Sequence, residues 1–262
     1  MSIRDFSSQR LFVEAGLSAG DVVPLDGDQA NYLLNVLRLR AGHSVLVFNG
    51  RDGEWRAVLR AEGRRALALD IGAQVRPQGG GPDIDYLFAP LKRARLDYMV
   101  QKAVEMGVGR LFPVLTRHTV ADRVNVERMR ANAIEAAEQC GILRLPEIRA
   151  PEKLMRVIET WDAGRALVFC DEGAGIADPV AALRDGLKCS VESGGAAAAA
   201  PPLAVLIGPE GGFSDDERGA LLELPSVIRL SLGPRILRAD TAAVAALAIV
   251  NAVAGDWRAW SR

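Results

Sequence analysis

From residue 83 to residue 254 the sequence repeats one pattern, a short apolar run followed by a helical segment. The runs are apolar at nearly every position, which is typical of strands that are buried on both faces. Strands that alternate with helices in this way predict an α/β fold, a parallel sheet covered by helices on both sides. The runs are DIDYLFAPL, RLFPVLT, RALVFCDE, PLAVLIG and VIRLSLG. The stretch after RALVFCDE has no clear pattern.

The first 75 residues consist mainly of short β-type runs broken by Gly, Asp and Asn. The sequence NGRDG at residues 49–53 predicts a hairpin. One short helix, DQANYLLNVLRLRAG, is expected to end at Gly42. We therefore predict a small β-barrel over residues 1–75, a Pro- and Gly-rich linker over 76–82 and the α/β domain over 83–262.

Charge and composition narrow the function classes. The net charge of the 262 residues is −1, with +1 over residues 1–80, +2 over 81–150 and −4 over 151–262. No global basic field indicates nucleic acid, and a mixed, solvated surface is the simplest interpretation. Three cysteines without CxxC spacing favour a reduced, cytoplasmic location, and neither a signal peptide nor a membrane span is expected. Two histidines give little support to a zinc site or a Ser-His-Asp triad, so no metal is expected.

The segment LIGPEGGFSDDE, Leu206 to Glu217, joins a buried strand to a helix. Ser214 and Glu217 have the spacing of a capping box, which predicts that the helix starts at this serine. The glycines before them allow the backbone to turn tightly and to approach a ligand. Ligands of open parallel sheets bind at the carboxyl ends of strands, where this loop lies. A plain glycine-rich connector is the alternative.

A second turn, LSLGPRILRADTAAVAA from Leu230 to Ala246, has the same design. Its strand ends at Gly233, and Asp240 or Thr241 is expected to cap the following helix. Two such turns near one edge of a sheet predict a concave binding site. Neither turn matches a phosphate loop or a Rossmann glycine motif, which argues against nucleoside triphosphate hydrolysis and dinucleotide binding.

These two turns resemble the C-terminal motifs of the SPOUT class of methyltransferases, and most closely those of the RsmE family, the 16S ribosomal RNA (uracil-N3) methyltransferases. The segments QRLFV, NYLLNVLRLRAGHSVLVFNG, APLKRARLDYMVQKAVEMGVGRLFPVLTRHTV and EAAEQCGILRLPEI resemble that family in the same order, so the resemblance covers nearly the whole chain. It departs at Asn31, where histidine is expected, and at Asp240, where Glu is common. The low-complexity segment Ser190–Pro202 also departs from it, and we interpret this segment as a surface loop.

The resemblance implies a PUA-like RNA-binding β-barrel followed by a parallel-sheet SPOUT domain with a C-terminal trefoil knot, which topology rules alone would not predict. It also implies a homodimer that binds S-adenosyl-L-methionine beside the knot, at the subunit interface. The cofactor-binding residues that it implies belong to the end of ALVFC or to the two glycine-containing turn segments. They are Phe169, Leu206, Ile207, Gly208, Pro209, Glu210, Gly211, Gly212, Leu232, Gly233, Ile236, Leu237, Arg238, Thr241 and Ala242.

The implied reaction methylates N3 of a uridine in the 16S ribosomal RNA of the small ribosomal subunit. Neutral uracil carries a proton at N3, so the site must remove this proton or stabilise the resulting anion. A guanidinium group can stabilise that charge, and Arg238 is the first catalytic candidate and Arg235 the second. A pair with Asp240 or Glu210, or a phosphate contact, is the alternative role for each arginine. Glu210 is a candidate to bind a ribose hydroxyl, to position Arg238 or to accept the proton.

Phosphate contacts are expected from basic side chains of the barrel and of the start of the second domain. The candidates are Arg10, Arg38, Arg40, Lys92, Arg93 and Arg95. Arg38 and Arg40 could instead bind carbonyls at a helix end, and each of the six could be a solvated surface charge. His118 is expected to be structural or to face RNA. The rival functions are methylation of transfer RNA or of a ribose 2′-hydroxyl, non-catalytic RNA binding in ribosome assembly, and a metabolic reaction with another nucleotide cofactor.

Overall fold

The computed structural model describes residues 8–63, 66–121, 123–192 and 202–258. Contacts divide the chain into two compact units, which we describe separately. Unit 1 contains Met1–Gly80 and Ala137–Leu145, and unit 2 contains Gly81–Ala136 and Pro146–Arg262. The sequence had placed residues 137–145 in the second domain and Arg76 in the linker, whereas Arg76 is the last residue of a strand.

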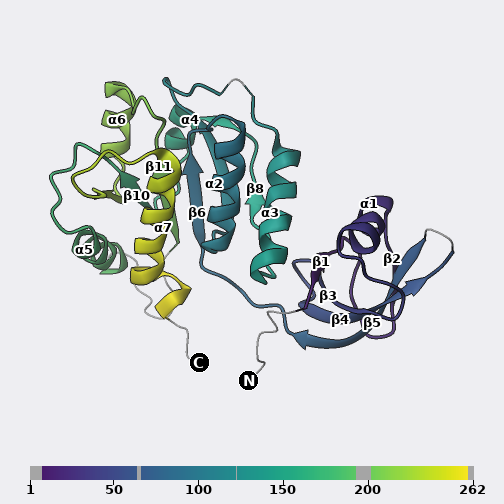
Figure 1. Ribbon diagram of the computed structural model, residues 1–262. Coiled ribbons are helices and arrows are strands. Elements are labelled where there is room, and N and C mark those ends of the chain that lie inside the picture. The colour runs from purple at the N-terminus through teal and green to yellow at the C-terminus, as the bar shows by residue number, and fades with distance from the viewer. Residues whose placement is uncertain (1–7, 64–65, 122, 193–201, 259–262) are drawn as a thin grey trace. The chain divides into compact units, whose positions relative to one another are not determined.

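Unit 1 is built on a five-stranded sheet in the order β1-β3-β4-β5-β2 (Figure 1). The strands are β1 (Arg10–Phe12), β2 (Val22–Pro24), β3 (Ser44–Phe48), β4 (Glu54–Ala61) and β5 (Leu67–Arg76). Only the β1–β3 pair is parallel among the described pairs of this sheet. Because β1 and β2 end the order without pairing with each other among the described residues, the predicted small β-barrel is a curled half-barrel sheet. Its PUA-like character is confirmed.

The helix of unit 1 changes its geometry along its length. α1 (Gly27–Asn31) begins with a capping box formed by Asp26 and Gln29, and it continues as a π-helical turn, η1 (Tyr32–Val36). Leu33 from this turn packs into the core of the half-barrel. The helix therefore ends before Gly42, where the sequence predicted its end.

The segment 137–145 contributes to a charged cluster in unit 1. Glu54, whose side chain is 2% exposed, accepts a hydrogen bond from Arg10 Nε at 2.9 Å and one from Arg76 Nε at 2.7 Å. Arg76 also donates to the carbonyl of Gly141 at 3.0 Å. The carboxylate of Glu138 accepts from the backbone N–H of Phe12 at 2.8 Å. Although burial raises the pKa of Glu54, the two arginines outweigh it and lower that pKa.

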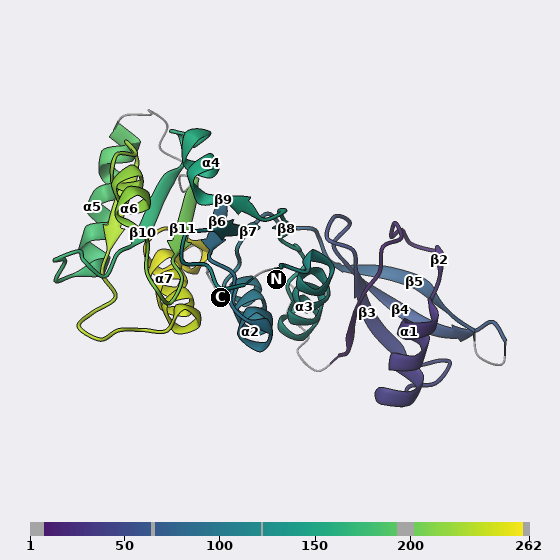
Figure 2. The same cartoon turned by 90° about the horizontal axis from the view of Figure 1, so that it is seen from above.

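Unit 2 is built on a parallel sheet in the order β12-β10-β11-β6-β7-β8 (Figures 1 and 2). Its strands are β6 (Ile84–Phe88), β7 (Arg110–Leu115), β8 (Glu147–Ile148), β9 (Glu152–Lys153), β10 (Ala166–Cys170), β11 (Leu203–Ile207) and β12 (Val227–Leu230). Its helices are α2 (Arg93–Glu105), α3 (Val126–Cys140), α4 (Leu154–Glu159), α5 (Pro179–Glu192), α6 (Asp215–Leu222) and α7 (Ala239–Ala254), with a short 3-10 turn η2 (Asp256–Arg258), and the unit boundary falls within α3. The predicted α/β class with a parallel sheet is confirmed.

Helices cover both faces of this sheet. α4 and α6 pack on one face, where Leu154 and Leu221 meet Phe169 of β10 and Leu206 of β11. α5 and α7 contact each other, and α5 lies on Ile228 of β12, which points away from that cluster. This double cover explains why the strands are apolar at nearly every position.

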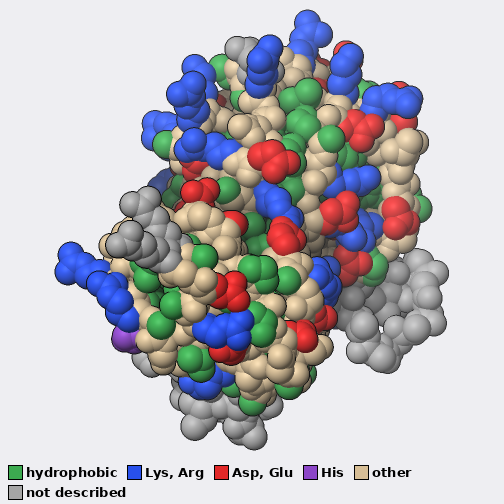
Figure 3. Space-filling view, turned by 90° about the vertical axis from the view of Figure 1, so that its right-hand side faces the viewer, with side chains coloured by type: hydrophobic (Ala, Val, Ile, Leu, Met, Phe, Trp, Pro, Cys, Tyr) green, Lys and Arg blue, Asp and Glu red, His purple; other side chains and the backbone are tan. Residues whose placement is uncertain are grey.

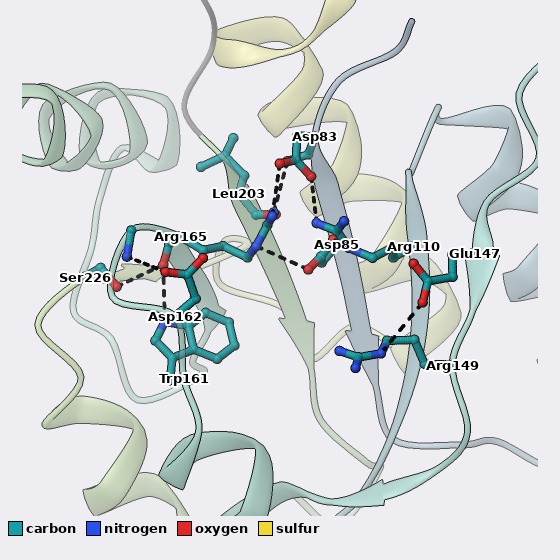
Figure 4. A network of polar contacts seen from close by, with 11 residues as sticks. Asp83, Asp85, Arg110, Glu147, Arg149, Trp161, Asp162, Arg165, Leu203 and Ser226 are labelled. Carbon is teal, nitrogen blue, oxygen red and sulfur yellow. Dashed lines mark hydrogen bonds and ion pairs between the residues drawn. The ribbon is translucent and has the colours of Figure 1, made fainter. Parts of the chain in front are cut away.

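The strands of unit 2 begin in a network of charged groups (Figure 4). Arg165 donates to Asp83 at 3.0 Å and to the carbonyl of Leu203 at 3.0 Å, and Arg110 donates to Asp83 at 2.7 Å and to Asp85 at 2.5 Å. Burial raises the pKa of Asp83, but hydrogen bonds and charge from Arg165 and Arg110 outweigh it and lower that pKa. Asp85 is more deeply buried, and there the effect of burial exceeds that of the two arginines, so its pKa is raised. The network ties strands β6, β7, β10 and β11 together at the edge opposite their carboxyl ends.

One part of the chain differs from the sequence prediction, and for another part the prediction is not tested. Helix α5 occupies the stretch that showed no pattern in the sequence. Most of the low-complexity segment Ser190–Pro202, residues 193–201, lies outside the described residues. Among the described helices, none is both long and apolar enough to cross a membrane.

Candidate active site

A cavity of about 590 Å³ lies at the carboxyl ends of β10, β11 and β12. This volume is in the range of small-molecule sites. The turn after each strand contributes to the wall, and so does the first turn of α7. Both glycine-containing turns singled out in the sequence therefore meet at one cavity in unit 2.

The turn after β11 is shaped by close packing and by a helix cap. A Cβ atom on Gly208 would lie 2.5 Å from the ring of Phe213, which also lines the cavity and packs edge-on against Phe169. Gly212 has φ = 69°, and its N–H donates to the carbonyl of Pro209 at 2.9 Å. The predicted capping box of Ser214 is confirmed, since its side chain and that of its partner each bind the other's backbone N–H. Small residues are thus required for the turn itself.

Glu217 completes this capping box and is buried. Its carboxylate accepts from the backbone N–H of Ser214 at 3.0 Å and from that of Arg117 at 2.8 Å. Arg117 belongs to the loop after β7. One carboxylate therefore joins the start of α6 to a loop that follows another strand.

The turn after β12 presents exposed side chains beside the cavity. Gly233 has φ = 96°, a conformation that suits glycine. Arg238, and not Asp240 or Thr241, is the N-cap residue of α7, and its side chain makes no capping bond. The predicted caps are wrong because α7 begins at Ala239, so that Asp240 lies within its first turn. The side chains of Arg235 and Arg238 form no hydrogen bond or ion pair with any described residue.

The turn after β10 adds residues that the sequence did not single out. Asp171 accepts from Arg218 of α6 at 2.9 Å and from Arg229 of β12 at 2.8 Å. Burial raises the pKa of Asp171, but its hydrogen bonds from the two arginines outweigh it and lower that pKa. Burial raises the pKa of the Cys170 thiol to about 12. Glu172 is exposed at the cavity, without a side-chain partner in the described part of the chain.

Most residues implied for cofactor binding lie in the cavity wall, as do the candidates Arg235 and Glu210. These are Ile207, Gly208, Pro209, Glu210, Gly212, Leu232, Gly233, Ile236, Leu237, Arg238 and Ala242. Phe169 and Leu206 do not line it because both are fully buried in the sheet. Gly211 faces His118 instead, and Thr241 is exposed in the first turn of α7. Residues of the wall that sequence reasoning missed include Asp171, Glu172, Phe213, Arg218 and Ser231.

The six basic candidates for phosphate contacts have different surroundings. Arg10 does not support its predicted role, because it is 8% exposed and paired with Glu54. Arg40 donates to the carbonyls of Leu34 and Leu39, the helix-end alternative. Arg38, Lys92 and Arg93 are exposed, and Arg95 forms an ion pair with Glu210.

Both signs of charge occur on the face of the molecule shown in Figure 3. Lys and Arg side chains are interspersed with Asp and Glu on the face shown in Figure 3, and several basic groups gather at its upper margin. In Figure 1 the arrow of β6 points toward that margin. Lys92 and Arg93 lie at the start of α2, the helix that comes after β6 in the chain. No group of three His, Cys, Asp or Glu residues suited to a metal occurs within the ranges that the structure describes.

Two family models match the chain. The RNA methyltransferase domain matches residues 80–251, and the RNA methyltransferase PUA domain matches residues 25–72. Ribosomal RNA small subunit methyltransferase E of Rickettsia conorii is 28% identical over 244 residues, which are 92% of this chain and 94% of that protein. The protein of the same name from Synechocystis is 31% identical over 236 residues, 88% of this chain and 73% of that protein.

Solved structures agree with these matches. A Legionella pneumophila protein described as a methyltransferase with the bound cofactor SAM is 25% identical, with a TM-score of 0.79 over 95% of this chain and 99% of that one. The fold also matches that of ribosomal RNA small subunit methyltransferase E from Neisseria gonorrhoeae, with 22% identity, a TM-score of 0.80 and the same coverage of 95% and 99%. Since the domain models account for most of the sequence and the relatives align along nearly its whole length, the chain belongs to the RsmE family of RNA methyltransferases.

Proposed function

We propose that this protein methylates N3 of a uridine in the 16S ribosomal RNA of the small ribosomal subunit, with S-adenosyl-L-methionine as the methyl donor. The observation that carries the proposal is the cavity where both glycine-containing turns meet, in a chain that belongs to the RsmE family. The relatives' names specify ribosomal RNA of the small subunit. A ribosomal substrate implies a cytoplasmic enzyme, in keeping with a sequence whose three cysteines show no CxxC spacing.

The wall of the cavity fits S-adenosyl-L-methionine. Apolar side chains such as Ile207 and Leu232 suit the adenine ring, and backbone groups of the two turns can form hydrogen bonds with its edge. The exposed carboxylate of Glu172 suits ribose hydroxyls or an ammonium group. When bound, the cofactor supplies the electrophilic methyl group, while the protein orients the acceptor and excludes water.

Arg238 and Arg235 are the residues that we assign to the acceptor uracil. Their guanidinium groups have no partner among the described residues, so the alternative ion pairs with Asp240 and Glu210 are not formed. Loss of the N3 proton places negative charge on the nitrogen and on the imide oxygens. A guanidinium group beside them stabilises this charge through its fixed fork of donors. Arg238 has the stronger case because it occupies the N-cap position of α7 and lines the cavity.

Glu210 also lines the cavity, and we propose fewer roles for it than the three that the sequence allowed. Its carboxylate pairs with Arg95 of α2, which fixes it at the edge of the cavity. Its carboxylate can still accept a hydrogen bond from a ribose hydroxyl or accept the uracil proton, since this side chain is 54% exposed. Because Arg95 is engaged, the phosphate contacts fall mainly to Arg38, Lys92 and Arg93.

We also propose a homodimer with the cofactor site at its interface, as the resemblance implies. Two large apolar side chains of unit 2 support this, since Ile236 is 88% exposed and Trp257 is 51% exposed. We also propose that the C-terminal part of unit 2 forms a trefoil knot, as the resemblance implies. Sedimentation equilibrium should give twice the chain mass of 28.1 kDa, and a monomer at micromolar concentration would contradict the dimer.

The decisive experiment is product analysis. Purified protein should transfer labelled methyl groups from S-adenosyl-L-methionine to the ribosomal RNA of small subunits prepared from cells that lack the enzyme. Digestion of that RNA should release N3-methyluridine. A 2′-O-methylated nucleoside or a labelled transfer RNA would overturn the assigned target, and an absence of transfer with intact cofactor binding would favour a non-catalytic assembly factor.

A further inference from the structure

The loop after β7 forms a compact turn beside the cavity. The hydroxyl of Thr119 accepts from the N–H of Thr116 at 2.9 Å and lies 2.9 Å from the hydroxyl of Thr116, and the N–H of Thr119 donates to the carbonyl of Thr116 at 3.2 Å. These bonds close Thr116–Thr119 on itself. Arg117 and His118 lie between the two threonines, and neither lines the cavity.

His118 contacts the turn after β11 directly. Its Nδ1 atom lies 3.1 Å from the carbonyl oxygen of Gly211 and 3.2 Å from that of Gly212. Carbonyl oxygens only accept, so the ring nitrogen must carry the proton and donate to both. A Cβ atom on Gly211 would lie 3.2 Å from the Cβ of His118, so the two segments are in close contact.

A second contact fixes the loop from which His118 projects. The backbone N–H of Arg117 donates to the buried carboxylate of Glu217, which also caps α6. The turn between Gly208 and Ser214 is therefore held at its end by Glu217 and at its middle by His118. Among the described residues, the carbonyls of Gly211 and Gly212 have His118 as their only side-chain hydrogen-bond partner.

We propose that His118 is a positioning residue, which donates a shared hydrogen bond from Nδ1 to the carbonyls of Gly211 and Gly212 and thereby keeps the turn in its ligand-binding form. The inference rests on the proposed function, in which this turn binds S-adenosyl-L-methionine. In this inference His118 takes no part in the chemistry, since it contacts the carbonyls of Gly211 and Gly212 and does not line the cavity. Its effect is on cofactor affinity and not on the methyl-transfer step.

The test compares three substitutions in the full-length protein. His118→Ala removes the donor, His118→Asn replaces Nδ1 with an amide nitrogen at a similar position, and His118→Gln places its nitrogen nearer to the former Nε2. Hydrogen exchange of amides 209–213 is measured without cofactor, and the Kd for S-adenosyl-L-methionine is measured by calorimetry well below each Tm. His43→Ala is the matched control, because His43 lies in unit 1 and its side chain forms hydrogen bonds only with Arg40 among the described residues.

We expect faster exchange in the turn and a Kd raised about 2- to 10-fold for Ala and Gln, the usual effect of one lost hydrogen bond, with kcat at saturating cofactor retained. The Asn variant and the His43→Ala control should remain close to wild type. Unchanged exchange and affinity in His118→Ala, or an Asn variant as weak as Ala, would overturn the inference while leaving the proposed function intact. Wild-type protein that binds no S-adenosyl-L-methionine would overturn both. If His118→Ala fails to fold, Gly211→Ala disturbs the same contact from the other side, and unchanged affinity there would also overturn it.

Discussion

Two side chains at the rim of the cavity, Arg235 and Arg238, differ from most arginines of unit 2. Arg110, Arg165 and Arg218 are all held by carboxylates, which fixes their direction and offsets their charge. The two rim arginines have no such partner in the described part of the chain, so their charge remains available to a ligand. A cation without a local counter-ion beside a binding cavity fits the stabilisation of an anion that forms during a reaction.

Arg238→Ala should lower kcat for RNA methylation about 100-fold or more, because a preorganised donor to developing charge contributes at this scale. The Kd for S-adenosyl-L-methionine should change little. Steady-state kinetics with small subunits and calorimetry with the cofactor separate the two effects. Arg235→Ala serves as the comparison and should lower kcat less. If cofactor binding collapses in Arg238→Ala while kcat at saturation persists, Arg238 binds the cofactor instead.

Gly208→Val should weaken cofactor binding by displacing Phe213, because even a Cβ at this position would lie 2.5 Å from the ring. The sequence indicated only that this glycine lets the backbone approach a ligand, and the structure shows that a side chain here would first meet Phe213. Gly219→Ala is the control, since its Cβ has no atom within 4 Å and alanine favours the helix by about 1 kcal/mol. Calorimetry and thermal melts of both variants test this. Equal affinity in Gly208→Val and wild type would contradict it.

At the scale of elements, the sequence pattern predicted those helices and strands whose position depends on residues close together in the chain. The strands of unit 2 and the capping box of Ser214 follow from apolar runs and from a serine-to-glutamate spacing. The start of α7 does not follow from the sequence pattern. Two residues that often cap helices, Asp240 and Thr241, lie inside its first turn, and Arg238 is at the N-cap position. Helix α5 was missed because an interrupted helical pattern gives a weak signal.

The candidate site was predictable to the same degree. The glycine-containing turns predicted the site, because a positive φ or close packing requires glycine and is therefore visible in the sequence. Phe169 and Leu206 do not line the cavity, because alternate residues of a strand point to opposite faces and tertiary packing decides which side is buried. Asp171 gave no local signal at all, because its partners Arg218 and Arg229 are distant in sequence.

The ion pairs of Asp171 join β10, α6 and β12 and should make stability depend on pH. The pKa of Asp171 is lowered from its usual value of 3.8, so the native state binds fewer protons than the unfolded state as the pH falls. The stabilisation is complete above the unfolded-state pKa and is lost as the pH falls through the folded-state pKa.

In Asp171→Asn the free energy of unfolding should fall by about 2 kcal/mol at neutral pH, since two arginines lose a charged acceptor. Urea denaturation at pH 6 and at pH 3 measures the dependence. The loss of stability between these pH values should be smaller in the variant than in the wild type. An identical loss in both proteins would show that Asp171 does not contribute.

At the scale of the whole molecule, the chain is not two units in series. Unit 1 takes residues 137–145 from the far end of α3 and uses them in its own charged cluster. Glu138 accepts the N–H of Phe12 in β1, and the Gly141 carbonyl accepts from Arg76 in β5. Strands β1 and β5, which do not pair with each other, therefore both depend on a distant piece of sequence.

A fragment of residues 1–80 should consequently be less stable than unit 1 within the full chain. It lacks both acceptors, and each lost hydrogen bond to a charged group costs about 1.5–3 kcal/mol. Hydrogen exchange of strands β1 and β5 in the fragment and in the full chain provides the comparison. Equal protection in both would show that residues 137–145 are dispensable. Full-length Glu138→Gln is a milder test, since it keeps an acceptor for Phe12 without the charge.

The discontinuous make-up of unit 1 also bears on the order in which the protein folds during its synthesis. The first 80 residues leave the ribosome before residues 137–145 exist, and ribosomes add about 5–20 residues per second. For several seconds the nascent half-barrel exposes Arg10, Glu54 and Arg76 without Gly141 beside them. The N-terminal unit, first to be translated, is therefore completed only after a large part of the second unit has emerged.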